Sequence, residues 1–127
     1  MNEKILIVDD SKLARMALAK GLGAALPDWP RLEAVNADEA LKILETSKIA
    51  MTFLDFNMPG RDGLALAAEI RAVDPAVQIA LISANHQTEV VTGATDIGAT
   101  FLTKPLNDKA LRDFIDLALA RLKATSS

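Results

Sequence analysis

The stretch KILIVDDS, from Lys4 to Ser11, joins a short apolar run to two adjacent carboxylates. An apolar run without alternation is typical of a β-strand that is buried on both faces. Asp9 and Asp10 repel each other when both are ionised, so their place at the end of such a strand is unfavourable for folding. Their presence therefore indicates a functional site.

Four further apolar runs follow along the chain, and several of them also lack alternation. They are RLEAV (31–35), IAMTFL (49–54), VQIALIS (77–83) and ATFLT (99–103). Continuous apolar runs favour parallel strands with both faces covered over an antiparallel sheet with one wet face. We therefore expect five parallel strands.

The segments between these runs carry apolar residues at helical spacing. The residues expected to face the core are Leu13, Met16 and Ala17, then Ala37, Ala40, Leu41 and Leu44, then Leu66, Ile70 and Val73, and finally Leu111, Phe114, Ile115, Ala118 and Leu122. Asp38 and Asn107 are candidate N-caps. Strands and helices thus alternate along the chain, which predicts an α/β fold with a doubly wound five-stranded parallel sheet, (βα)5.

The segment NHQTEVVTGATDIGAT (85–100) is poor helix material. It is rich in β-branched residues and contains Gly93. Both features lower the intrinsic preference for a helix. We expect a short and labile fourth helix here.

Length and composition indicate one domain. The 127 residues suit a single domain over 1–127, with an ordered core of about 3–123 and a short C-terminal tail. No apolar stretch approaches the roughly 20 residues of a membrane span. The chain lacks cysteine, has a net charge of −3 and scatters its basic residues. We therefore expect a cytoplasmic protein that has no disulfides and contacts neither nucleic acid nor membrane.

Polar side chains end several of the expected strands. Asp9 and Asp10 follow the first strand, Asp55 follows the third, Ser83 ends the fourth and Lys104 follows the fifth. Taken singly, such an aspartate or serine would be a helix cap, and the lysine a surface amine. In an open parallel sheet, however, ligands bind beyond the carboxyl ends of the strands. Together these residues predict a site at that edge.

The chemistry of this residue set favours phosphoryl transfer. Clustered carboxylates, in a chain without cysteine or a second histidine, suit a hard divalent cation, and Mg²⁺ fits best. An aspartate beside such a cation and a lysine can attack phosphorus as a nucleophile. Lys104 would neutralise phosphoryl oxygens, and Ser83 would donate a hydrogen bond to one of them. The residues therefore predict an aspartyl phosphate.

Four motifs resemble the receiver domain of bacterial two-component response regulators along essentially the whole chain. They are VDDS (8–11), FLDFNMPGRDG (53–63), Ser83 followed by Ala84, and FLTKP (101–105). The resemblance implies a flavodoxin-like strand order, 2-1-3-4-5, and a cis peptide bond between Lys104 and Pro105. The roles that it implies are Asp55 as phosphoacceptor, Asp9, Asp10, Asp55 and the Asn57 carbonyl as Mg²⁺ ligands, Lys104 as phosphate-pairing lysine, and Ser83 and Phe101 as switch residues.

The resemblance implies a signalling switch rather than an enzyme, of the stand-alone, chemotaxis-regulator kind. Asp55 would accept a phosphoryl group from a sensor histidine kinase or a histidine phosphotransfer protein, with self-catalysed transfer and autodephosphorylation. The phosphate would be relayed, or it would change the docking of an unknown protein on the fourth helix (within 85–100), the last strand (99–103) and the last helix. Ser83 lacks the methyl group of the commoner threonine, which predicts a looser switch. Phe101 lacks the hydroxyl of a tyrosine.

Two other functions fit parts of the pattern. A haloacid-dehalogenase-like phosphatase also uses a strand-end aspartate, here Asp55, as nucleophile. It needs an acidic residue two positions later, where this chain has Asn57. A flavodoxin-like electron carrier would need a Ser/Thr/Gly-rich phosphate loop after the first strand, and VDDSKLARM (8–16) is no such loop.

Four remaining residues have structural interpretations. His86, the single histidine, is expected at a loop or helix start and not as a phosphorelay site. Trp29 is expected to pack over its own connection. Asp62 and Gly63 are expected to be turn residues, with the glycines of PGRDG supplying positive φ.

Overall fold

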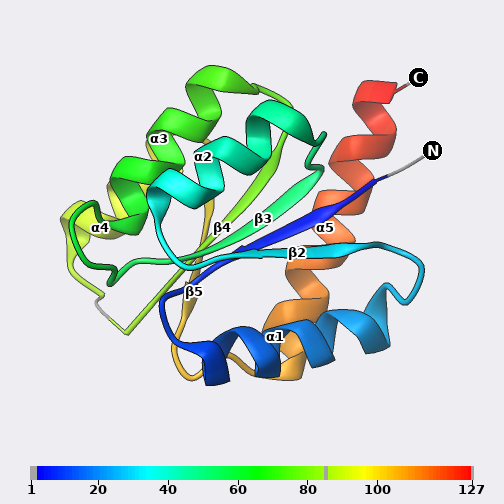
Figure 1. Cartoon of the computed structure of the whole chain (residues 1–127), viewed down its shortest axis with the longest axis horizontal. Helices are drawn as coiled ribbons and strands as arrows, with labels where there is room; N and C mark the ends of the chain where they lie inside the picture. Colours follow the sequence, from blue (N-terminus) through cyan, green and yellow to red (C-terminus); the bar gives the residue numbers. More distant parts are fainter. Residues whose placement is uncertain (1–2, 85, 127) are drawn as a thin grey trace.

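A computed structural model describes residues 3–84 and 86–126, which form five strands and five helices (Figure 1). The strands are β1 (Ile5–Val8), β2 (Arg31–Ala34), β3 (Met51–Asp55), β4 (Gln78–Ser83) and β5 (Thr100–Thr103). The helices are α1 (Lys12–Ala25), α2 (Ala37–Thr46), α3 (Gly63–Val73), α4 (Thr88–Asp96) and α5 (Asp108–Ser126). All strand pairs are parallel, in the order β2-β1-β3-β4-β5. The predicted doubly wound α/β fold and its strand order are confirmed.

Helices cover both faces of the sheet, with α2, α3 and α4 on one face and α1 and α5 on the other (Figure 1). Successive side chains of a strand point to opposite faces. In β1, Leu6 and Val8 accordingly belong to one core cluster and Ile5 and Ile7 to the other, and all four are at most 1% exposed. This double burial is the reason why the apolar run in KILIVDDS does not alternate.

The inward face of α1 differs from the predicted one. Leu13 and Met16 are 78% and 54% exposed, and Ala17 is also exposed. The helix packs instead through Leu22, which is fully buried, and through Leu18, which is partly buried. Both sets of residues have the helical period, so only the packing of α1 against the sheet decides which set is buried. In α3, the prediction holds for Leu66 and Ile70 but fails for Val73, the last helical residue, which is 66% exposed.

One of the two predicted helix caps is confirmed and the other is wrong. Asn107 caps α5, because its side-chain oxygen accepts a hydrogen bond from the backbone N–H of Ala110 at 2.7 Å. The cap of α2 is Asn36 rather than Asp38, and it accepts from the N–H of Glu39 at 2.9 Å. Asp38 lies in the first turn, where a negative charge still favours the helix N-terminus.

The fourth helix is short, as predicted, with nine residues from Thr88 to Asp96. Within the described residues, the side chain of its N-cap residue Gln87 makes no capping hydrogen bond. Its predicted lability remains a prediction, and Asn85 lies outside the described residues. At the other end of the chain, α5 continues to Ser126, beyond the expected end of the core at 123.

Trp29 is partly buried and packs against the core cluster on the α1 and α5 face, which confirms its structural interpretation. Among the helices of residues 3–84 and 86–126, none has the length and apolar character that a membrane span requires.

Of the two glycines in the PGRDG segment, one has the predicted positive φ and the other does not. Gly60 has a φ of 82°, as predicted for a turn glycine. Gly63 is instead the first residue of α3, and Asp62 is the cap of that helix, accepting from the N–H of Ala65 at 2.8 Å. A Cβ atom on Gly63 would lie 2.4 Å from the backbone oxygen of Asp55. Glycine is therefore needed here because α3 begins directly against the end of β3.

The replacement Gly63→Ala should lower the free energy of unfolding by about 1–3 kcal/mol, because the added methyl group meets backbone that cannot move aside. Gly23→Ala is the matched control, since a Cβ there first meets the flexible Arg31 guanidinium at 3.4 Å. Alanine should stabilise α1 at this position by about 0.5–1 kcal/mol. Urea denaturation measures both, and unchanged stability in Gly63→Ala would contradict the close approach.

Candidate functional site

Three aspartates come together at the carboxyl ends of β1 and β3. One carboxylate oxygen each from Asp9, Asp10 and Asp55 lies within 4.8 Å of the other two. The register explains the meeting, because Val8 pairs with Leu54 and the next residues, Asp9 and Asp55, therefore stand side by side. Asp9 and Asp55 are 9% and 5% exposed, whereas Asp10 is exposed.

The environment of Asp9 is unfavourable for a charged carboxylate. Burial raises the pKa of Asp9 above its ordinary value, and the charges of Asp55 and Asp10 raise it further. A hydrogen bond from the Ser11 N–H to Asp9 Oδ1, at 2.9 Å, and the charge of Lys104 both lower this pKa. Because the net shift is upward, the contribution of Asp9 to stability is present at low pH and is lost as pH rises through its folded-state pKa.

Lys104 supplies a positive charge to the cluster. Its Nζ donates to Asp55 Oδ1 at 2.6 Å, and its side chain is 38% exposed while that of Asp55 is 6% exposed. Since β4 lies between β3 and β5, the lysine reaches Asp55 across the end of β4. The backbone N–H of Lys104 donates to the oxygen of Ser83 at 3.0 Å, and the Lys104–Pro105 peptide bond is cis, as predicted.

The predicted switch residues lie on β4 and β5, the two strands that follow β3 in the sheet. Ser83 is fully buried at the end of β4 and pairs with Thr103. Phe101 is partly buried against the core cluster beneath α2, α3 and α4. Its ring meets the ring of His86 edge to face, with centroids 6.0 Å apart. His86 is exposed in the connection before α4, which confirms the loop location expected for it.

Asn57 lies exposed in the loop between β3 and α3. Backbone hydrogen bonds close the base of this loop, from the N–H of Phe56 to Ile82 O and from the N–H of Gly63 to Phe56 O, both at 2.9 Å. The loop therefore begins next to the carboxylates, and Asn57 is two residues from Asp55.

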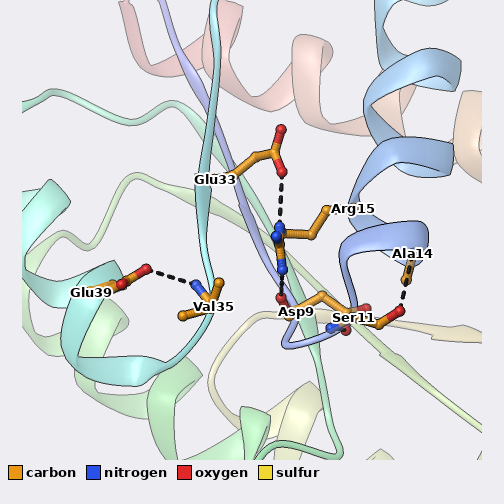
Figure 2. A network of polar contacts seen from close by, with 7 residues as sticks. All are labelled: Asp9, Ser11, Ala14, Arg15, Glu33, Val35 and Glu39. Carbon is orange, nitrogen blue, oxygen red and sulfur yellow. Dashed lines mark hydrogen bonds and ion pairs between the residues drawn. The ribbon is translucent and has the colours of Figure 1, made fainter.

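Arg15 is a residue at this site that the sequence did not single out. Figure 2 shows its guanidinium between Asp9 and Glu33. Its Nη1 donates to the backbone oxygen of Asp9 at 2.7 Å, and its Nε donates to Glu33 Oε1 at 2.8 Å. No spacing rule joins residues so far apart in the chain, so only the fold reveals this contact.

A hard divalent cation fits the donor set. The three aspartates offer only oxygen ligands, which magnesium prefers, and their oxygens are already close together. Burial is the main cause of the raised pKa of Asp9, and the negative charges of Asp55 and Asp10 add repulsion to it. A bound cation would offset this repulsion.

The fold and the site define a flavodoxin-like α/β protein with an acidic, lysine-paired site at the carboxyl edge of its sheet. The family model of the response regulator receiver domain matches residues 5–116. The chain therefore belongs to the receiver domain family of two-component systems. Members of this family are signalling switches that accept phosphate from kinases or phosphotransfer proteins, and they usually bind Mg²⁺ at an aspartate cluster.

Several known proteins are similar over most of this chain. Sporulation initiation phosphotransferase F of Bacillus subtilis is 28% identical over 116 residues, which are 91% of this chain and 92% of that protein. The transcriptional activator protein ExaE of Pseudomonas putida is 34% identical over 101 residues, which are 79% of this chain but only 47% of that protein. The crystal structure of a response regulator receiver domain protein from Methanospirillum hungatei is 21% identical, with a TM-score of 0.89 over 98% of this chain and 99% of that one.

The replacement Asp10→Asn should stabilise the metal-free protein, because it removes one of the charges that repel ionised Asp9. We expect a gain of about 0.2–1 kcal/mol, as for other exposed charge pairs. The same change should weaken Mg²⁺ binding, since it replaces one of the three clustered carboxylates by a neutral amide. Thermal melts in chelator and in Mg²⁺ measure both effects, and a lower midpoint in chelator would count against a shared acidic site.

Proposed function

We propose that this chain is a receiver domain that accepts a phosphoryl group on Asp55 in a Mg²⁺-dependent reaction. The observation that carries the proposal is the setting of Asp55. Its carboxylate is nearly buried, pairs with Lys104 at 2.6 Å and lies within 4.8 Å of carboxylate oxygens of Asp9 and Asp10. This setting supports the roles of Asp55 as nucleophile, Lys104 as charge partner and the aspartates as metal ligands.

In the proposed reaction, a carboxylate oxygen of Asp55 attacks the phosphorus of the donor. A bond from oxygen to phosphorus forms, the bond from phosphorus to the donor atom breaks, and that atom leaves with the electron pair. The ammonium group of Lys104 faces the negative charge of the transferred group, and the Ser83 hydroxyl donates a hydrogen bond to it. Asp9, Asp10, Asp55 and the Asn57 carbonyl would hold Mg²⁺, which would neutralise phosphoryl oxygens when bound.

The residues disfavour sustained phosphatase turnover. A haloacid-dehalogenase-like enzyme requires an acid or base two residues after its nucleophile, and the amide of Asn57 can serve as neither. We therefore propose a switch that transfers phosphate to itself and loses it by autodephosphorylation, rather than an enzyme.

The phosphoryl donor in this proposal is a sensor histidine kinase or a histidine phosphotransfer protein in the cytoplasm. The similarity to sporulation initiation phosphotransferase F, a protein named for phosphate transfer, supports a role of this domain in passing phosphate on. We propose that the output partner docks on α4, β5 and α5, and that Ser83 and Phe101 change this surface after phosphorylation.

Acetyl phosphate should phosphorylate the protein without a kinase, because the domain supplies the attacking oxygen and its charge partners. Intact-protein mass spectrometry should show one added phosphoryl group in Mg²⁺ and none in excess chelator. Asp55→Asn should abolish the added mass while the fold is kept. Lys104→Ala should retain folding but impair the switch, since only a charge partner is lost.

Asp62→Asn is the matched control for the labelling experiment, because Asp62 is a cap of α3 and its replacement keeps a capping oxygen. It should be labelled like the wild type. Labelling that persists in Asp55→Asn, or that continues unchanged in chelator, would place the chemistry on another residue or in another mechanism.

The surface around α4 should change when Asp55 is phosphorylated. A Cβ on Gly93 would lie 2.7 Å from the Leu64 side chain, so α4 already packs closely on α3. We expect a population shift between packings of this short helix, with altered hydrogen exchange from 86 to 101 in the presence of an acyl-phosphate mimic and Mg²⁺. Amides of α2 should serve as the internal control, and unchanged exchange from 86 to 101 would contradict the proposed switch.

A further inference from the structure

The backbone of Asp9 lies where the pairing between β1 and β2 stops. The last paired residues are Val8 and Ala34, and the N–H of Asp9 still donates to the oxygen of Ala34 at 3.1 Å. Since β2 ends at Ala34, the carbonyl oxygen of Asp9 has passed the end of the strand pairing. Buried carbonyl groups need a donor. Arg15 provides it from α1, at 2.7 Å.

The guanidinium of Arg15 is itself held in place. Its Nε donates to Glu33 Oε1 at 2.8 Å, and the Arg15 side chain is only 12% exposed (Figure 2). Glu33 precedes Ala34 in β2, so the N–H and the C=O of Asp9 are tied to two consecutive residues of the same strand. The N–H makes a direct backbone hydrogen bond to Ala34, whereas the C=O is connected to Glu33 through the Arg15 side chain.

The first turn of α1 completes the attachment of Asp9. The N–H of Ser11 donates to Asp9 Oδ1 at 2.9 Å, which orients the carboxylate. The backbone N–H of Arg15 donates to the oxygen of Ser11 at 3.0 Å, while its side chain returns to Asp9. Arg15 thus links Ser11, which orients the Asp9 carboxylate, to the backbone of Asp9.

We propose that Arg15 is a positioning residue for the metal site, which it serves by fixing Asp9 for Mg²⁺ binding. This inference rests on the proposed function. Arg15 acts through geometry, because its charge is directed at Glu33 while its other donor holds a backbone oxygen. Lysine keeps the charge but has no planar fork that can make both bonds at fixed angles. Arg15→Lys therefore separates geometry from charge.

The test is a Mg²⁺ titration of the full chain, in which NMR monitors the backbone amides of residues 9–11. Arg15→Lys should weaken Mg²⁺ binding roughly tenfold, as is usual when a residue that orients a metal ligand is replaced. The matched control is Arg71→Lys. Arg71 also donates to backbone oxygens, those of Val77 and Ile97 at 2.7 and 2.8 Å, but these precede β4 and β5 at the opposite edge of the sheet. The control should melt at lower temperature and bind Mg²⁺ like the wild type.

A second pair of variants tests the anchor of Arg15 and covers the possibility that Arg15→Lys does not fold. Glu33 is partly exposed, so its replacement should be tolerated. Glu33→Gln keeps an oxygen that accepts from Arg15 and should keep the wild-type affinity, whereas Glu33→Ala should bind Mg²⁺ severalfold more weakly.

The outcomes distinguish a failure of the positioning role of Arg15 from a failure of the proposed function. Arg15→Lys or Glu33→Ala with lowered stability but wild-type Mg²⁺ affinity would overturn the positioning role and leave the proposed function intact. A wild-type protein that binds no Mg²⁺ in the same titration would overturn the proposed function and this inference with it.

Discussion

Asp9 and Asp55 stand side by side at the ends of two adjacent strands, nearly buried, and the burial of Asp9 together with the charge of Asp55 raises the pKa of Asp9. The rest of the site follows from this constraint. Two buried carboxylates need positive charge, and Lys104 brings part of it across the end of β4 to Asp55 at 2.6 Å. The repulsion that remains favours binding of a divalent cation at the expense of the stability of the metal-free protein.

Packing contacts and hydrogen bonds hold Asp9 and Asp55 close together despite the repulsion between their charges. Asp55 is backed by α3, which begins so close to β3 that its first residue must be Gly63. Asp9 is tied on one side by the Ser11 N–H and on the other by Arg15, which Glu33 holds in turn. The contacts of Gly63 and Arg15 hold the backbone that carries the two carboxylates, and the Ser11 N–H orients the carboxylate of Asp9. The conflict between charge and stability is therefore maintained by packing and by backbone hydrogen bonds.

On the side of the site formed by β4 and β5, the sequence gives α4 a low helix preference. The fourth helix has nine residues, and its β-branched composition lowers its helix preference. Phe101 is only partly buried beside the exposed His86, although Leu81, which pairs with it in the sheet, is fully buried. The predicted lability of α4 would suit a switch, because a small change at the site could then select between packings of the helix.

The sequence by itself determined the strands, their parallel arrangement and the residues at their carboxyl ends. It could do so because the apolar runs in KILIV and MTFL are buried on both faces, and because any residue just after such a strand reaches the same edge of the sheet. The choice between helix faces, by contrast, required the tertiary structure. Leu13 and Met16 have the same period as the buried Leu18 and Leu22 face, and only contact with the sheet separates the two. The roles of Arg15 and Gly63 also depended on the fold, since one bridges α1 to β1 and β2 and the other meets the backbone of β3. A sequence pattern records the local period of a segment, whereas contacts between segments exist only after the chain has packed.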